Sequence, residues 1–461
     1  ILVFLGGNSL NQLSVKPNFN AVQRYQGWVK HIEAIYDPNQ VGDVMRRAFH
    51  ALRNGAPGPV VIELISDVCS QTVSEEAQNY TSPRLTRQIP EPLEIEATAD
   101  ALLASKTPMI WAGAGVLFSG SSDALKELSQ LTSIPVFCTM PGKSGFDERD
   151  PLSLGSGCGT TTRMAHEWLK NSDVILALGS SLTRSPYAQA IPKGKILIQN
   201  TNNPDDINKN EPIKINLVGD TKLTIENLIT VIKKKTQNNG FGDLEKTASK
   251  IKVIKERWLA EWHNSLNSDE EPISYYRVIQ EINKNLDLEN SIVTHDAGAP
   301  RDTIVPFFSA TIPHSYIGWG KTTHLGFGIP LMIGAKMAQP EKFCLNLMGD
   351  GAFGMSGTDL ETAVRSGAAI TTVLLNNSAM ATYSGPLQGT IGEEARNRYG
   401  VSSMHGDYAK IAEGMGAIGI KVSKPDDIGS ALKEAQVQNK KGKTVLIEVE
   451  ANIEQRRSKF Q

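Results

Sequence analysis

Two short polar motifs in the last third of the chain carry the residue types that metal and phosphate chemistry requires. Gly349-Asp350-Gly351 and Asn376-Asn377 each follow an apolar run. If these runs are adjacent parallel strands, Asp350 and Asn377 meet at the carboxyl edge of one sheet, where open α/β sheets bind ligands. Their oxygens suit Mg²⁺, which usually takes one or two such protein groups plus phosphate oxygens and water. Each motif alone is most often a plain turn, but together they predict a metal–diphosphate site in which the glycines let the backbone approach a phosphate.

The elements that would position these motifs follow a strand–turn–helix rhythm. Helix-like segments separate short apolar runs, and Thr358-Asp359-Leu360-Glu361 has the capping-box pattern that begins a helix. Short apolar strands that alternate with helices favour parallel sheets covered on both faces. The predicted fold class is therefore α/β, with three doubly wound parallel-sheet domains. The predicted strands include residues 60–64, 108–112, 134–138, 173–179, 195–199, 343–348 and 369–375.

Length and composition limit the class of protein. The 461 residues suggest about three domains. The chain has 47 Lys and Arg against 49 Asp and Glu, and this near balance argues against a nucleic-acid partner. The four cysteines include no CxxC pair, so we expect neither a disulfide framework nor a Cys-rich zinc site. No apolar run reaches the ~18 residues of a membrane helix. We expect a cytoplasmic enzyme with a small-molecule substrate and no membrane partner.

The spacing of the two motifs resembles the signature of enzymes that use thiamine diphosphate. Two sequence segments that precede these motifs, residues 326–330 and 333–336, resemble the acetolactate synthase group of these enzymes. The resemblance extends over nearly the whole chain. Residues 55–60 are similar to the end of the family's pyrimidine-binding domain, and similarity to its central domain is carried by residues 134–136, 141–143, 150–155 and 203–207.

This resemblance implies a domain organisation. Residues 1–82 would be the C-terminal part of the pyrimidine-binding domain, and residues 90–232 a Rossmann-like central domain. A linker with a helix would follow at 233–270, and the diphosphate-binding domain would take residues 271–461. The resemblance also implies that the N-terminal part of the first domain is absent from this chain.

The resemblance implies roles for single residues around a bound Mg²⁺ and thiamine diphosphate. Asp350, Asn377 and the backbone carbonyl of Ala379 would hold the metal. Leu325 would prop the cofactor in a bent shape. Relatives often carry polar side chains just after the position of Gly298, where this chain has Ala299-Pro300. The further residues implied to contact the diphosphate are Asp296, Gly298, Gly349, Gly351 and Ala352.

The activity implied is the making or breaking of a carbon–carbon bond next to a carbonyl. A thiazolium carbanion would add to a 2-oxo acid, as in acetolactate synthase-like carboligation or decarboxylation. The nearest alternative is a lyase or decarboxylase of a 2-hydroxyacyl-CoA or oxalyl-CoA, because residues 351–357 are similar to oxalyl-CoA decarboxylases. An alternative of another class is a non-catalytic cofactor-binding subunit. It stays open because the family's activating Glu has no match in residues 1–82, which leaves the catalytic residue unassigned.

Three further expectations concern a proton donor, a flavin and assembly. His324, beside Leu325, is a candidate proton donor, although a lone His is more often structural. Acetolactate synthases carry FAD, but the arginine-rich segment that accompanies it is not matched at residues 179–184, so FAD is unsupported. In this family the two ends of the cofactor bind to different subunits. The resemblance therefore implies a homodimer or homotetramer.

Overall fold

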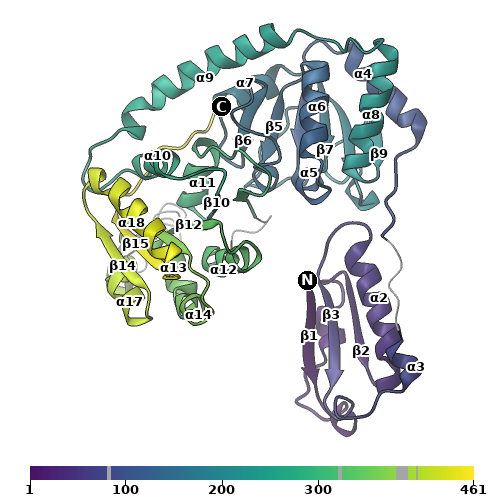
Figure 1. Ribbon diagram of the computed structural model, residues 1–461, viewed down its shortest axis with the longest axis vertical. Coiled ribbons are helices and arrows are strands. Elements are labelled where there is room, and N and C mark those ends of the chain that lie inside the picture. The colour runs from purple at the N-terminus through teal and green to yellow at the C-terminus, as the bar shows by residue number, and fades with distance from the viewer. Residues whose placement is uncertain (80–84, 320–323, 381–392, 401–402, 461) are drawn as a thin grey trace. The chain divides into compact units, whose positions relative to one another are not determined.

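The structure, a computed structural model, describes residues 1–79, 85–319, 324–380, 393–400 and 403–460 (Figure 1). The chain divides into two compact units, the first formed by residues 1–89 and the second by most of the remainder. The described residues form three sheets, and every strand pair with a defined register is parallel. The predicted α/β class with three parallel-sheet regions is confirmed, whereas the domain limits stay predictions.

The first unit contains a three-stranded sheet in the order β1-β3-β2. Helix α2 packs Val44 and Ala48 against Val60 and Ile62 of this sheet. Strand β3 lies between the other two, which explains its almost continuous apolar sequence. The elements are β1 (Leu2–Gly7), β2 (His31–Ile35), β3 (Val60–Ile65), α1 (Ala21–Tyr25), α2 (Val41–Arg53) and α3 (Glu75–Gln78).

The second unit contains two six-stranded sheets, of which the central one has the order β6-β5-β4-β7-β8-β9. The predicted apolar runs form its strands, which are β4 (Met109–Ala112), β5 (Val136–Thr139), β6 (Ser153–Gly157), β7 (Val174–Leu178), β8 (Ile196–Thr201) and β9 (Ile215–Val218). The helices of this region are α4 (Pro92–Ala104), α5 (Ala114–Phe118), α6 (Ser122–Thr132), α7 (Arg163–Asn171) and α8 (Thr221–Lys235). The long helix α9 (Leu244–Leu266) follows them.

The C-terminal sheet has the order β11-β10-β12-β13-β15-β14. Its strands are β10 (Ser291–His295), β11 (Tyr316–Ile317), β12 (Phe343–Gly349), β13 (Thr371–Asn376), β14 (Ile418–Val422) and β15 (Val445–Glu450). Its helices are α10 (Tyr275–Asn285), α11 (Ala299–Phe307), α12 (Gly328–Ala338), α13 (Asp350–Ser356), α14 (Asp359–Arg365), α16 (Glu393–Tyr399), α17 (Tyr408–Gly414) and α18 (Ile428–Lys440).

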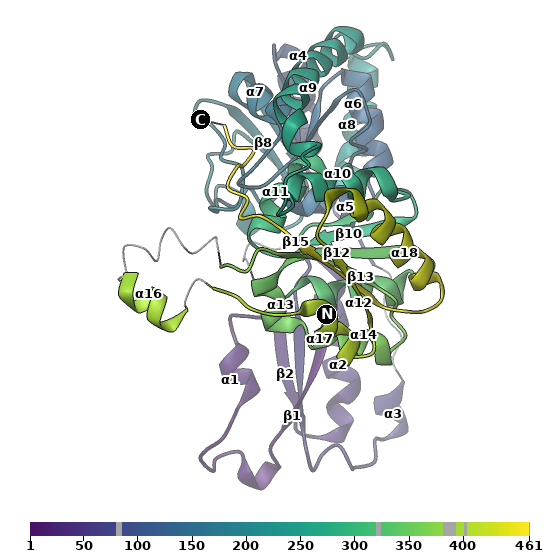
Figure 2. The same ribbon diagram turned by 90° about the vertical axis from the view of Figure 1, so that its left-hand side faces the viewer.

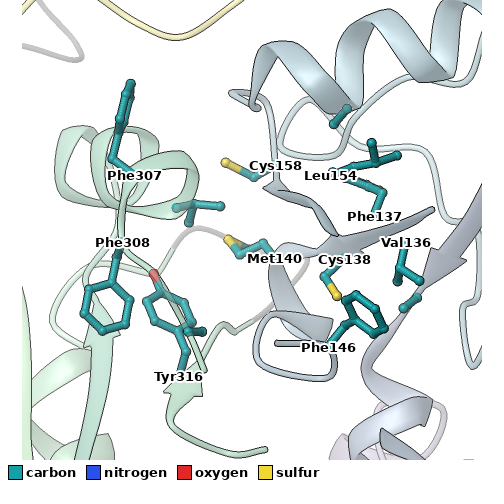
Figure 3. Close-up of a cluster of buried hydrophobic side chains, with 14 of the residues drawn as sticks. Val136, Phe137, Cys138, Met140, Phe146, Leu154, Cys158, Phe307, Phe308 and Tyr316 are labelled. Carbon is teal, nitrogen blue, oxygen red and sulfur yellow. The ribbon is translucent and has the colours of Figure 1, made fainter. Parts of the chain in front are cut away.

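Helices cover both faces of the C-terminal sheet because successive strand residues point to opposite sides. On one face Leu345 and Leu347 of β12 belong to a core that includes residues of α10, α11 and α18. On the other face Cys344 and Met348 of the same strand pack with α12, α14 and α17. Both sheets of the second unit share the first of these cores, in which Met140 and Cys158 lie near Phe307 and Tyr316 (Figure 3).

The C-terminal segment after β15 returns to the central sheet's helices (Figure 2). The Ser458 hydroxyl donates to the backbone oxygen of Thr161 over 2.6 Å, and the Trp258 indole donates to Ser458 Oγ over 3.2 Å. These bonds tie the two sheets of the second unit together. None of the helices that the structure describes has the length and apolar character needed to traverse a bilayer.

A helix begins directly after Thr358, as predicted, but another helix precedes it and Thr358 does not cap it. Helix α13 begins at Asp350, and Thr358 has helical backbone angles with no capping hydrogen bond, so the predicted capping box is wrong. A capping residue needs extended backbone. The Gly357 N–H donates to the Phe353 oxygen over 2.6 Å at the end of α13, so the chain reaches Thr358 while still coiled.

Candidate functional site

A cavity lies where β10, β12 and β13 end, and its empty volume, which includes some open solvent, is about 690 Å³. Of the predicted site residues, eight line this cavity: Gly298, Leu325, Gly349, Asp350, Gly351, Ala352, Asn377 and Ala379. Asp296 and His324 do not line it. The other lining residues are Tyr187, Tyr275, Ala297, Ala299, Pro300, Arg301 and Met380. Parallel strands thus bring the two polar motifs together, as their spacing predicts.

Asp350 is a buried carboxylate with one unused oxygen. Its side chain follows β12 directly, and the residue is 3% exposed. The Gly351 N–H donates to Oδ1 over 2.8 Å, whereas Oδ2 has no hydrogen-bond partner in the described part of the chain. Burial raises the pKa of Asp350, against the lowering effect of the backbone N–H groups of Gly351, Ser378 and Ala379. A buried carboxylate oxygen without a partner is destabilising, so the arrangement favours a cation beside it.

A cation at this carboxylate would need oxygens from other chemical groups. Among the residues described, no cluster of three or more His, Cys, Asp or Glu side chains could hold a metal. The available groups are the amide oxygen of Asn377 and the carbonyl of Ala379, from two residues that line the cavity. One carboxylate with neutral oxygens and open positions is the donor set of a Mg²⁺ that also binds phosphate.

The turn after β13 fixes the Asn377 amide. The Ala379 N–H donates to Asn377 Oδ1 over 3.0 Å, and Asn377 Nδ2 donates to the Tyr275 hydroxyl oxygen over 2.7 Å. Between them Ser378 has φ +52°, which is uncommon for a residue with a side chain. The turn is further held by the Met404 N–H, which donates to the Ser378 oxygen over 3.0 Å.

A buried glutamate on β15 holds the strained part of this turn. Glu448 is 1% exposed and accepts hydrogen bonds from Asn376 Nδ2 and from the Ala409 N–H, each over 2.8 Å. Asn376 Oδ1 in turn accepts from the Ser378 N–H over 3.1 Å. Sequence reasoning missed Glu448, although a charged residue within the apolar run 445–449 is a signal that could have indicated it.

Replacing Glu448 with Gln should lower the free energy of unfolding by about 1–3 kcal/mol. The amide nitrogen of Gln would face either Asn376 Nδ2 or the Ala409 N–H, and that donor would lose its acceptor. Glu450→Gln is the matched control, since Glu450 lies two residues further on the same strand and is exposed. Guanidinium unfolding followed by circular dichroism measures both variants. Equal stability of the two variants would contradict the role given to Glu448.

The local geometry accounts for the presence of glycine at two positions of the cavity. A Cβ on Gly351 would lie 2.4 Å from Met380 Sδ, so any other residue there would displace that flexible side chain. Gly298 has φ +83° and directly precedes α11, a backbone conformation that favours glycine. Both let the backbone form the cavity wall at close range, as the diphosphate hypothesis requires.

Asp296 lies behind the cavity wall, where it holds a loop. Its Oδ1 accepts from the N–H groups of Ala297 (2.7 Å) and Gly326 (3.0 Å), and its Oδ2 accepts from that of Gly328 (2.9 Å). The side chain is fully buried, and burial raises its pKa against these three donors. Asp296 therefore fixes the loop that carries Leu325 into the cavity, and its predicted contact with a diphosphate stays a prediction.

Two family models match the second unit. Residues 296–449 match "Thiamine pyrophosphate enzyme, C-terminal TPP binding domain", and residues 95–228 match "Thiamine pyrophosphate enzyme, central domain". Together these matches cover more than half of the chain. The chain belongs to the thiamine pyrophosphate enzymes. The C-terminal match includes every residue that lines the cavity except Tyr187 and Tyr275.

Curated relatives of this thiamine pyrophosphate enzyme carry acetolactate synthase names. The chain is 29% identical over 438 residues to a "Probable acetolactate synthase large subunit" of Methanocaldococcus jannaschii, with 89% of this chain and 70% of the relative covered. It is 26% identical to "Acetolactate synthase isozyme 3 large subunit" of Escherichia coli, with 91% and 73% covered. It is 27% identical to "Acetolactate synthase catalytic subunit, mitochondrial" of Saccharomyces cerevisiae, with 97% and 66% covered.

Some site residues of this thiamine pyrophosphate enzyme carried no signal in the sequence. Arg301 lines the cavity just after Ala299-Pro300, donates to Asp302 Oδ1 over 2.7 Å and lies 4.7 Å from the centre of the Tyr187 ring. His324 is exposed, and its role as a proton donor stays a prediction. No glutamate is among the described residues that line the cavity.

Proposed function

We propose that this thiamine pyrophosphate enzyme binds its cofactor through Mg²⁺ and makes or breaks a carbon–carbon bond next to the carbonyl of a 2-oxo acid. The bound cofactor supplies a carbanion that attacks carbonyl carbon. The observation that carries the metal assignment is the buried Oδ2 of Asp350, which has no partner among the described residues, in a cavity that Asn377 and Ala379 also line. The curated relatives support an acetolactate synthase-like reaction.

The chain's own residues would bind and orient the cofactor. Asp350, Asn377 Oδ1 and the Ala379 carbonyl would hold Mg²⁺, which neutralises the diphosphate charge. The backbone N–H groups at the start of α13, which begins at Asp350, would face the diphosphate, together with the backbone at Gly298. Leu325, half-buried at the cavity wall, would supply an apolar surface under the cofactor.

Product analysis separates this function from its nearest alternative. The protein would be incubated with Mg²⁺ and thiamine diphosphate and then given pyruvate, oxalyl-CoA or a 2-hydroxyacyl-CoA. We expect acetolactate and carbon dioxide from pyruvate, and no product with Asp350→Asn. Conversion of a CoA thioester alone would assign the lyase or decarboxylase function instead, and turnover of none of these substrates would contradict the proposal.

We also propose that the enzyme acts as a homodimer or homotetramer. Every described residue of the metal–diphosphate cavity comes from the second unit, and in this family a different subunit holds the other end of the cofactor. A closed two-fold assembly supplies that second half with the same surface on both chains. Light scattering should give at least twice the mass of one chain, and a fully active monomer would contradict this.

A further inference from the structure

Tyr275 occupies the boundary between the candidate metal site and the protein core. It is the first residue of α10, is 1% exposed and lines the cavity. Its hydroxyl oxygen lies 2.7 Å from Asn377 Nδ2, across 102 positions of the sequence. This is a side chain–side chain contact with one of the proposed metal ligands.

The direction of this hydrogen bond follows from the turn after β13. The Ala379 N–H can only donate, so the atom of the Asn377 amide that faces it must be Oδ1. The other amide atom, Nδ2, therefore faces Tyr275 and donates to it. Tyr275 acts as the acceptor, which keeps Oδ1 on the side of Ala379 with a lone pair to spare.

The hydroxyl proton of Tyr275 is left for another acceptor. In the part of the chain that the structure describes, this hydroxyl accepts from Asn377 Nδ2 and donates to no protein group. A tyrosine hydroxyl ordinarily has a pKa of about 10, so it carries its proton at neutral pH. A buried donor without an acceptor is unfavourable, and at this position it borders the cavity.

We propose that Tyr275 is a positioning residue of the metal–diphosphate site. It holds the Asn377 amide with its oxygen turned to the metal, and it offers its own O–H to an anionic oxygen bound in the cavity. The inference rests on the proposed function and adds to it a contact from outside the two sequence motifs. Without the hydroxyl the amide loses the acceptor that fixes its rotation, and the bound anion loses a donor.

Tyr275→Phe tests this role, because it removes the hydroxyl and keeps the buried ring. Tyr276→Phe is the matched control. Tyr276 is the next residue of α10, is also buried, and donates to the Arg456 oxygen over 2.7 Å outside the cavity. Calorimetry on the full chain would measure thiamine diphosphate binding at several Mg²⁺ concentrations, and thermal melting without ligand would report on stability.

We expect Tyr275→Phe to weaken cofactor binding about tenfold and to raise the Mg²⁺ concentration for half-saturation, while Tyr276→Phe binds like the wild type. Both variants should lower the melting temperature to a similar extent. In an Asn377→Ala background, adding Tyr275→Phe should weaken binding less than it does alone, since part of its effect passes through that amide.

The outcomes separate this inference from the function on which it rests. If the wild type binds thiamine diphosphate equally well with and without Mg²⁺, or does not bind it at all, both the proposed function and the role of Tyr275 are contradicted. If the wild type needs Mg²⁺ and Asp350→Asn abolishes binding, but Tyr275→Phe binds as well as Tyr276→Phe, the role of Tyr275 alone is overturned. If Tyr275→Phe weakens cofactor binding by the same factor in the wild type and in the Asn377→Ala background, Tyr275 does not act through the Asn377 amide.

Discussion

Asp350→Asn should abolish Mg²⁺-dependent binding of thiamine diphosphate while raising the melting temperature of the ligand-free protein. Loss of the charged ligand should weaken cofactor binding by about a hundredfold or more, because charge-assisted contacts contribute about 1.5–3 kcal/mol each. The same change removes a buried charge whose Oδ2 has no partner among the described residues. The ligand-free protein should therefore gain about 1 kcal/mol of stability at pH 7.

The stability that ligand-free Asp350→Asn gains over the wild type should increase with pH. Burial raises the pKa of Asp350, so the folded protein holds this proton more tightly than the unfolded chain does. The ionised carboxylate thus destabilises the fold once the pH rises past the unfolded pKa, and the full penalty applies above the folded pKa. The stability advantage of Asp350→Asn should be present at pH 7 and disappear towards pH 3.

The control for this experiment is Asp359→Asn on α14, which does not line the cavity. Calorimetry with and without Mg²⁺ and thermal melting at several pH values would compare the two variants. Wild-type cofactor affinity in Asp350→Asn would refute the metal assignment. A lower melting temperature at pH 7 would refute the claim that the ligand-free carboxylate is destabilising.

Asp296→Ala should lower the free energy of unfolding by about 3 kcal/mol or more, since three buried N–H donors would lose their acceptor. It should also weaken cofactor binding, because the released loop carries Leu325. Asp287→Ala is a suitable control. Asp287 likewise accepts three hydrogen bonds, from the N–H groups of Glu289 and Asn290 and from Asn290 Nδ2, but it is exposed.

Guanidinium unfolding gives the stability of both variants, and little change is expected for Asp287→Ala because water can replace the lost acceptor. Asp296→Asn should lie between the wild type and Asp296→Ala, since its amide oxygen can still accept from some of the three donors. If Asp296→Ala unfolds at the same denaturant concentration as Asp287→Ala, Asp296 does not hold the loop.

The strands and the main site motifs were predictable because their signals are local. Apolar runs bounded by turn residues indicated β12 and β13, and a carboxylate and an amide just after them indicated the site edge. Helix α13 was missed because Gly349-Asp350-Gly351 reads as a turn, and glycine disfavours helix in isolation. The helix forms there because the chain continues directly from β12 into the packed layer beside the sheet.

The residues that support the site were not predictable, because their partners are distant in the sequence. Tyr275 contacts Asn377 across 102 positions, and Glu448 contacts Asn376 across 72. Such pairings depend on which strands and helices become neighbours, and no local pattern encodes that. For Asp296 the family resemblance implied a contact with the diphosphate, but no local pattern indicated that its carboxylate accepts hydrogen bonds from three backbone N–H groups.

Asp350, Asn377 and Ala379 should together hold a metal that binds the diphosphate of the cofactor. A crystal structure of the chain with thiamine diphosphate and Mn²⁺ in place of Mg²⁺ tests it most directly, because Mn²⁺ is located by its anomalous scattering. We predict one peak bonded to the Asp350 carboxylate, Asn377 Oδ1 and the Ala379 carbonyl, with the diphosphate beside Gly351. A metal bound elsewhere, or an empty cavity at saturating cofactor, would contradict this metal assignment.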